Sequence, residues 1–185
     1  MKVKNHYFVL RHGDTVWTKT EKIYPWPDGL NVHLTAEGKE AIRRAAKRLK
    51  GEKIDLIFSS DLYRTKQSSG IVAKELKLKV KFDKRLRDTF LGKYYHGRLK
   101  KDFYADFPDP TKRFTTGPKG GETWNDVRQR VKSFLLDVEK ENQGKNILII
   151  GHGDPLWLLE GLVHNMTNEE LLKHGIINKA ELKEL

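Results

Sequence analysis

Two histidines stand in matching surroundings in this sequence, each directly before a glycine and shortly after a short apolar run. His12 follows the run 7–10, and His152 follows the run 146–150, each with one residue between. Runs of this length are typical of buried strands rather than helices. Open α/β sheets bind ligands at the carboxyl ends of their strands. If both runs lie in the middle of one parallel sheet, we expect the two histidines to face each other across a single cleft.

Arginine is the second residue type here that favours phosphate chemistry. Arg11 precedes His12, and Arg64 follows a third apolar run, residues 54–58. A guanidinium fork matches phosphate oxygens, imidazole can attack or move protons near neutral pH, and Gly13 would let a ligand approach the backbone. One histidine alone could equally be a hydrogen-bonded loop residue. Two histidines and two arginines together predict a pocket for a dianionic phosphoryl group.

Helical patterns alternate with these strands. Apolar spacing and capping residues predict helices over 36–49, 62–76, 122–139 and 156–163, a stop at Gly51, and a short helix after the capping box at Thr167. Residues 77–82 alternate as in a half-solvated strand, residues 176–185 form at most an edge strand, and residues 87–121 form a long irregular stretch. This order predicts a three-layer α/β/α sandwich with a mainly parallel central sheet, built as a single catalytic domain over residues 1–185.

Composition narrows the function classes. The chain has 36 lysine and arginine residues against 25 aspartate and glutamate residues, a formal net charge of +11. The basic residues form no single block, which favours a solvated surface or steering of anionic substrates over nucleic-acid binding. No cysteine is present, no secretory leader precedes the first strand, and no apolar run nears the roughly 18 residues of a membrane span. We therefore expect a cytoplasmic protein without a membrane partner, and the oligomeric state stays open.

Metal and serine hydrolase chemistry find little support in the sequence. Neither His12 nor His152 has a neighbour at metal-ligand spacing, so no metal is expected. The other five histidines, His96 among them, are scattered and are interpreted as structural or solvated. A Ser-His-Asp hydrolase would need a Gly-x-Ser-x-Gly elbow, which is absent.

Six segments, taken in order, resemble motifs of the histidine phosphatase superfamily, the family that includes the phosphoglycerate mutases. The first, Leu10 to Trp17, is similar to the opening Arg-His-Gly-Glu-Thr-x-Trp-Asn motif, and Gly151-His152-Gly153 corresponds to the second histidine. The four between them are Leu34 to Gly38, Ser59 to Thr65, Leu86 to Gly92 and Gly120 to Thr123. Together the segments cover nearly the whole chain. The resemblance implies a phosphoglycerate mutase-like α/β fold.

The resemblance also implies an activity: hydrolysis of a small anionic phosphate monoester through a phosphohistidine, without a cofactor. His12 would be the nucleophile. Asp88, in the place of the family's usual glutamate, would protonate the leaving oxygen and then activate water. Arg11, Arg64 and His152 would bind the phosphoryl oxygens, and His152 belongs with the catalytic groups as well. Their charge would replace that of the metal found in many other phosphatases.

Three departures from the family pattern bear on the site. Thr18 stands where an asparagine commonly binds the phosphoryl group, and its hydroxyl could serve instead. Asp154 could donate the proton in place of Asp88, repel an anionic substrate, or cap the helix that begins at Pro155; capping is the preferred interpretation. The segment after Gly92 is one residue longer than usual, so substrate selectivity there stays open.

Two other functions remain as alternatives to a phosphatase. The chain is short for a phosphoglycerate mutase and lacks an Arg-Arg-Ser-Tyr-like insertion between Gly92 and Gly121. A weakly active module that recognises phosphate or nucleic acid would use the basic surface. Several basic and aromatic residues could rim the cleft or be ordinary loop residues: Lys93, Tyr94, Tyr95, Arg98, Lys100, Lys101, Lys112, Arg113 and Lys119.

Overall fold

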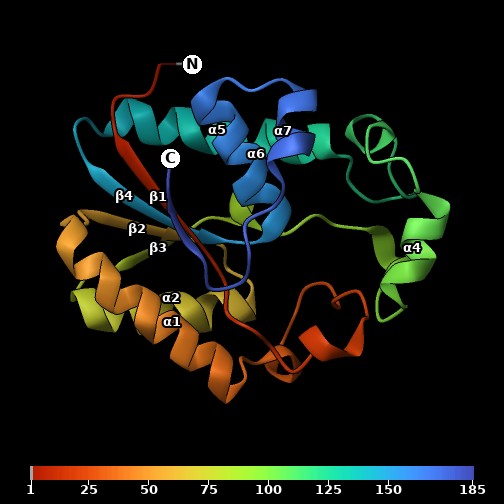
Figure 1. Ribbon diagram of the computed structural model, residues 1–185, viewed down its shortest axis with the longest axis horizontal. Helices are drawn as coiled ribbons and strands as arrows, with labels where there is room; N and C mark the ends of the chain where they lie inside the picture. The colour runs from red at the N-terminus through yellow and green to blue at the C-terminus, as the bar shows by residue number, and fades with distance from the viewer. Residues whose placement is uncertain (1) are drawn as a thin grey trace.

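A five-stranded sheet runs through the middle of the protein (Figure 1). A computed structural model describes residues 2–185. The strand order is β3-β2-β4-β1-β5; β3, β2, β4 and β1 are parallel, and β5 pairs antiparallel with β1 at one edge. The bounds are His6–Arg11 (β1), Leu56–Ser59 (β2), Val80–Phe82 (β3), Asn146–Gly151 (β4) and Leu182–Glu184 (β5). The predicted mainly parallel sheet is confirmed, as is an edge strand within 176–185.

Helices cover both faces of the sheet, which makes the predicted three layers. On one face lie Ala36–Arg48 (α1) and Tyr63–Leu76 (α2); on the other lie Trp124–Glu141 (α5), Gly153–His164 (α6) and Asn168–His174 (α7) (Figure 1). Alternate residues of the central strands reach opposite faces because side chains alternate along a strand. Val9 and Ile149 pack toward α5 and α6, whereas Leu10 and Ile150 pack toward α1 and α2. This double burial explains the nearly continuous apolar runs.

The starts of α1 and α7 agree with the predicted caps, because capping is a local interaction. Thr35 accepts a hydrogen bond from the Gly38 amide at the start of α1, and Thr167 forms a capping box with Glu170 at the start of α7. The predicted stop at Gly51 is wrong. The chain instead continues as a 3-10 helix, Leu49–Glu52 (η3), and turns at Lys53, whose φ of 48° is left-handed. The other 3-10 helices are Thr18–Thr20 (η1), Leu30–Val32 (η2), Lys84–Leu86 (η4) and Lys112–Phe114 (η5).

Strands β2 and β3 are shorter than predicted. β2 begins at Leu56 rather than at residue 54, because Asp55 binds the Asn146 amide through its side chain at the strand's start. β3 covers only Val80–Phe82 of the predicted 77–82, since Lys77 takes a left-handed conformation to end α2. Only three residues of β3 then pair with β2.

The stretch 87–121 is not irregular as predicted. It contains Gly92–Tyr95 (α3), Lys100–Asp106 (α4) and η5. Ile23, Tyr95 and Phe103 form a small separate apolar core under these turns, which is why they can be ordered. The Ile23 amide donates to the Arg98 carbonyl at 2.8 Å, so the segment is also tied to the loop after β1. In Figure 1 α4 lies well away from the sheet.

Within residues 2–185, none of the helices has the length and apolar character required to cross a membrane.

Candidate active site

The parallel register brings the two histidines together at the carboxyl ends of β1 and β4. Arg11 pairs with Gly151, so His12 and His152 leave neighbouring strands at the same level. Their ring centroids lie 5.3 Å apart, edge to face, and both residues are buried. They therefore touch each other beneath the cleft, and the expectation that they face each other across it is wrong. Adjacent strands, about 4.8 Å apart, leave no room for a cleft between them.

His12 is held as a neutral imidazole with one defined tautomer. Its Nδ1 lies 2.8 Å from the Gly13 carbonyl oxygen, which can only accept, so Nδ1 carries the proton. Nε2 therefore keeps its lone pair, and the Arg64 Nε donates to it at 3.2 Å. Burial and the nearby charges of Arg64 and Arg11 lower the pKa of His12 well below its usual value. A neutral Nε2 is the form of histidine that can act as a nucleophile.

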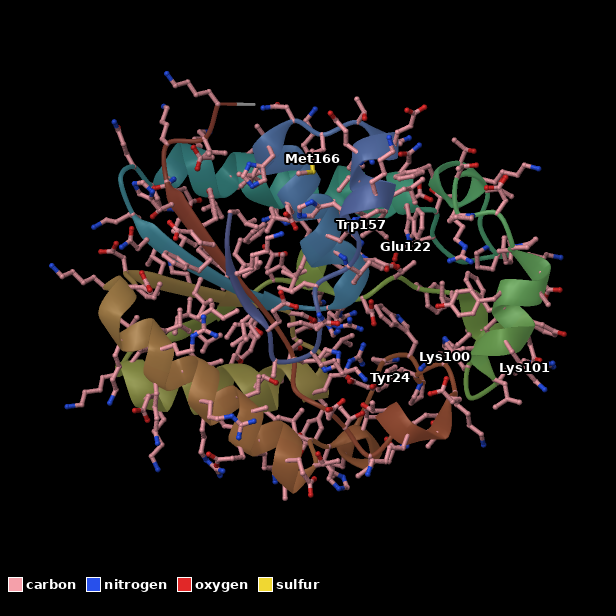
Figure 2. The ribbon with its side chains drawn as sticks, viewed as in Figure 1. Tyr24, Lys100, Lys101, Glu122, Trp157 and Met166 are labelled. Carbon is pink, nitrogen blue, oxygen red and sulfur yellow. The ribbon has the colours of Figure 1, made fainter. Side chains whose placement is uncertain are left out.

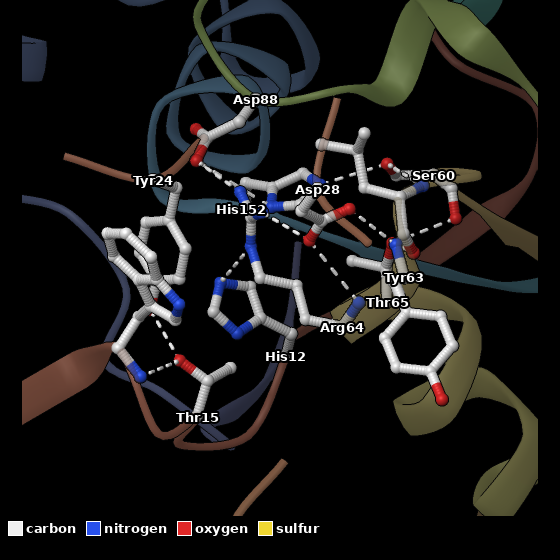
Figure 3. A network of polar contacts seen from close by, with 12 residues as sticks. His12, Thr15, Tyr24, Asp28, Ser60, Tyr63, Arg64, Thr65, Asp88 and His152 are labelled. Atoms are coloured by element: carbon white, nitrogen blue, oxygen red, sulfur yellow. Dashed lines mark hydrogen bonds and ion pairs between the residues drawn. The ribbon is translucent and has the colours of Figure 1, made fainter. Parts of the chain in front are cut away.

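Arg64 is the centre of the polar network in Figure 3. It is 1% exposed, and besides its contact with His12 it donates to Asp28 at 2.6 Å and to Asp88 at 2.8 Å. Its guanidinium also lies 4.3 Å from the centroid of the Tyr24 ring. Two carboxylates and an aromatic face offset the cost of burying this cation.

Asp28 is a member of this network that sequence reasoning missed. Its side chain is fully buried, and besides Arg64 it accepts from the Tyr63 amide at 2.6 Å. Leu62, the N-cap of α2, provides no side-chain cap, so Asp28 supplies one from a distant loop. No local pattern around Asp28 marks it, because its partners lie 35 and 36 residues further on.

Replacing Asp28 with alanine should lower the free energy of unfolding by about 3 kcal/mol, since it leaves the buried Arg64 cation with one carboxylate instead of two and removes the cap of α2. Urea unfolding monitored by circular dichroism measures this. Asp14→Ala is the matched control: Asp14 is half exposed and pairs with Lys179 at 3.3 Å. The control should lose less than about 1 kcal/mol. Equal losses in both variants would mean that Asp28 has no special structural role.

His152 and Asp88 lie on the other side of Arg64. The Ser60 hydroxyl contacts His152 Nε2 at 2.9 Å and also accepts from the Leu62 amide at 3.3 Å. His152 Nδ1 makes no hydrogen bond within residues 2–185 and lies 3.7 Å from the Asp88 carboxylate. Burial and the charge of Arg64 lower the pKa of His152 well below its usual value.

Arg11 lines the cleft beside these groups. Its Nη1 donates to the Ile177 carbonyl at 2.8 Å, whereas its buried Nε has no hydrogen-bond partner in the described chain. A Cβ added to Gly153 would come within 3.3 Å of the Arg11 guanidinium carbon and 3.0 Å of Ile176. Gly153 therefore makes room for the arginine.

Gly13 has a packing role, so the predicted approach of a ligand to its backbone finds no support. A Cβ at Gly13 would lie 2.5 Å from the carbonyl oxygen of Gly38, in the first turn of α1. A Cβ at Gly38 would in turn clash with the Asp14 carbonyl oxygen, at 2.2 Å. The two glycines let the loop after β1 lie directly on α1, which fixes the backbone next to His12.

Asp154 is not the helix cap that we expected. The N-cap of α6 is His152, without a side-chain cap, and Asp154 lies one residue inside the helix. Its carboxylate accepts from the Thr89 hydroxyl at 2.6 Å and from the Trp124 indole at 3.1 Å, across the cleft wall. Burial, and then the negative charge of Asp88, raise the pKa of Asp154. A carboxyl group with a raised pKa therefore lines the site beside Asp88.

Thr18, a predicted site residue, does not line the cleft. Its hydroxyl accepts from the Thr15 amide at 3.0 Å and from Lys179 at 2.9 Å, and it lies 3.4 Å from the Tyr24 hydroxyl. These contacts order the loop after His12.

The cleft itself has a volume of about 380 Å³. Arg11, Arg64, Asp88 and Asp154 line one part of it, above the buried histidines. Of the nine basic and aromatic residues expected to rim it, two line it, Lys100 and Arg113. His96, interpreted as structural or solvated, lines it too. Residues 2–185 contain no group of three His, Asp or Glu side chains arranged to hold a metal ion.

A mainly parallel sheet that ends in two touching histidines and a buried arginine defines a phosphoglycerate mutase-like fold. Residues 7–185 match the histidine phosphatase superfamily (branch 1), and the chain belongs to this family.

Known relatives carry names of both mutases and phosphatases. The chain is 31% identical over 153 residues to phosphoglycerate mutase-like protein 4 of Arabidopsis thaliana, a match that covers 78% of this chain and 65% of that protein. It is 26% identical over 153 residues to phosphoserine phosphatase 1 of Hydrogenobacter thermophilus, covering 80% and 71%. The structure of a mycobacterial glucosyl-3-phosphoglycerate phosphatase superposes with a TM-score of 0.85 at 24% identity, covering 97% of this chain and 91% of that one. The chain thus spans about two thirds of the Arabidopsis protein.

Proposed function

We propose that this chain hydrolyses phosphate monoesters through a phosphohistidine, acting on a small anionic phosphorylated substrate, with residues 1–185 as one catalytic domain. The observation that carries the proposal is the state of His12. It is buried, neutral and of a fixed tautomer, and its Nε2 lone pair points at the most buried arginine of the site. A histidine with a purely structural role would need neither an unprotonated Nε2 nor an arginine donating to that atom.

In the first step, the phosphoryl group of the ester displaces the contact between Arg64 and His12. Arg64 and Arg11 then donate to phosphoryl oxygens, and His152 donates through its unpartnered Nδ1. The ester enters as its monoanion and gives its proton to Asp88 as the phosphoryl oxygens replace Asp88 on Arg64. The His12 Nε2 lone pair forms the N–P bond while the ester P–O bond breaks. The leaving oxygen takes the electron pair and this proton from Asp88, and the alcohol departs.

In the second step, water attacks the phosphorus of the phosphohistidine. Asp88, now a carboxylate, takes a proton from the water as the new P–O bond forms. The N–P bond breaks, its electron pair returns to His12 Nε2, and inorganic phosphate leaves. Asp88 returns its proton to the departing phosphate and His12 ends neutral, so the scheme balances without a cofactor.

A phosphoglycerate mutase is the second candidate, because the Arabidopsis relative has that name. The two functions differ in what happens to the phosphoryl group. We expect the pure protein to release phosphate from p-nitrophenyl phosphate and from 3-phosphoglycerate, with the same rate in EDTA. Isomerisation of 3-phosphoglycerate without phosphate release, followed by NMR, would replace the phosphatase with a mutase.

A further inference from the structure

The cleft is much larger and more apolar than a phosphoryl group requires. Beyond the phosphoryl-binding end it continues toward α4, and its wall there is largely aromatic or aliphatic. Its volume of about 380 Å³ falls in the range that holds drug-sized ligands. A three-carbon phosphorylated acid would leave most of this wall uncovered. The apolar lining residues are Ile23, Tyr24, Trp26, Leu91, Phe103, Tyr104, Trp124 and Ile176.

Arg113, in η5, lines the same cleft, and uncharged groups hold its guanidinium in place. Its guanidinium donates twice to the Phe107 carbonyl, at 3.1 and 2.7 Å, and lies 4.8 Å from the centroid of the Tyr104 ring. No carboxylate among residues 2–185 forms an ion pair with it. The other two arginines of the cleft are the phosphoryl-binding pair. Arg113 is therefore an ordered cation with its charge available to an anionic ligand.

Lys100 adds a second cation on the α4 side. Its Nζ is 3.8 Å from the Glu21 carboxylate, which is largely exposed, so the pairing is weak. Figure 2 shows Lys100 on the side of α4 that faces Tyr24, whereas its neighbour Lys101 lies at the outer side. Lys100 lines the cleft and Lys101 is exposed.

Trp124 indicates how far apart the two charged ends lie. Its indole nitrogen donates to Asp154, which lines the phosphoryl-binding end, and its ring lies 5.7 Å from the Arg113 guanidinium carbon. A single indole thus separates the phosphoryl-binding end from Arg113. For this reason the ligands of the test have a bicyclic body.

We propose that the substrate class is a phosphate monoester with a flat aromatic or similarly extended apolar body that carries a second anionic group. The phosphoryl group binds at Arg11 and Arg64, the body lies against Tyr24 and the neighbouring apolar wall, and the second anion binds Arg113 and Lys100. The inference rests on the proposed function and deepens it. Burial of the apolar body and a charge-assisted hydrogen bond to the second anionic group would both increase the binding affinity of such a ligand.

The test compares two esters that differ by one carboxylate: 2-naphthyl phosphate and 6-carboxy-2-naphthyl phosphate. The wild-type protein should prefer the carboxylated ester, measured as the ratio of the two kcat/KM values. Arg113→Gln should lower this ratio about tenfold or more, and Lys100→Gln should lower it less. Lys101→Gln is the matched control and should leave the ratio unchanged.

A wild-type ratio at or below one would overturn the inference, and so would a preference that survives both Arg113→Gln and Lys100→Gln. Because both values of the ratio come from the same variant, a general loss of activity cancels. If neither ester is hydrolysed, the phosphatase proposal fails. Calorimetric titration of the same esters then decides the ligand class: weaker binding of the carboxylated ester to Arg113→Gln supports it, and equal binding overturns it.

Discussion

Replacing His12 with asparagine should abolish turnover of p-nitrophenyl phosphate, lowering kcat by at least about 10⁴-fold. No other group in the scheme forms a bond to phosphorus, because Arg11 and Arg64 stay protonated and the scheme has His152 donate a hydrogen bond from Nδ1 to a phosphoryl oxygen. Asparagine is chosen because its amide can still donate to the Gly13 carbonyl. The assay is phosphate release under saturating substrate, together with a search for acid-labile phosphate on the wild-type protein.

The fold of this variant is checked by its stability as a function of pH. Burial lowers the folded-state pKa of His12, so below about pH 6.5 the unfolded chain binds a proton that the folded protein does not. Above this pH neither state gains a proton at His12, so its contribution to stability is complete. As the pH falls below it, the free energy of unfolding decreases by up to about 1.4 kcal/mol per pH unit. His12→Asn should unfold cooperatively and lose less stability than wild type between pH 7 and pH 5. A folded variant with wild-type turnover would contradict the mechanism.

The residues that the sequence did predict share one property: each follows a strand. In a parallel sheet the carboxyl ends of the strands converge, so His12, His152 and Arg64 could be placed together without knowing any loop. Asp88 was placed from a resemblance instead, and it does lie within 2.8 Å of Arg64. The three layers of the fold could be predicted from the apolar spacing along the chain, because this spacing decides which face of each helix and strand is buried.

What the sequence could not predict depends on contacts between distant loops. Asp28 lies in a segment rich in proline and glycine, and nothing there distinguishes a buried carboxylate from an exposed one. Asp154 looked like a cap because it stands near the start of a helix; Trp124, 30 residues earlier in the chain, holds it in the cleft wall instead. The turns within 87–121 likewise depend on Ile23, a partner from another part of the chain.

Asp88→Asn is the second change with a large expected effect, and its size should depend on the leaving group. An alkoxide is a poor leaving group and needs its proton during P–O cleavage, whereas nitrophenolate is already a stable anion. The loss should therefore be about 10²–10³-fold with glycerol phosphate and less than about 10-fold with p-nitrophenyl phosphate. Measuring kcat/KM for both esters gives the two losses directly.

Asp154→Asn is the comparison that decides which carboxyl group donates the proton. Both side chains line the cleft, and burial with the charge of Asp88 raises the pKa of Asp154. Asp88, however, is the one that contacts Arg64 and lies 3.7 Å from the His152 Nδ1, so it lies beside the groups that bind the phosphoryl oxygens. Asp154→Asn should slow both esters by similar factors, because its loss disturbs Thr89 and Trp124 in the wall. If the leaving-group dependence followed Asp154 instead, the proton would come from α6, and Asp88 would serve only to orient Arg64.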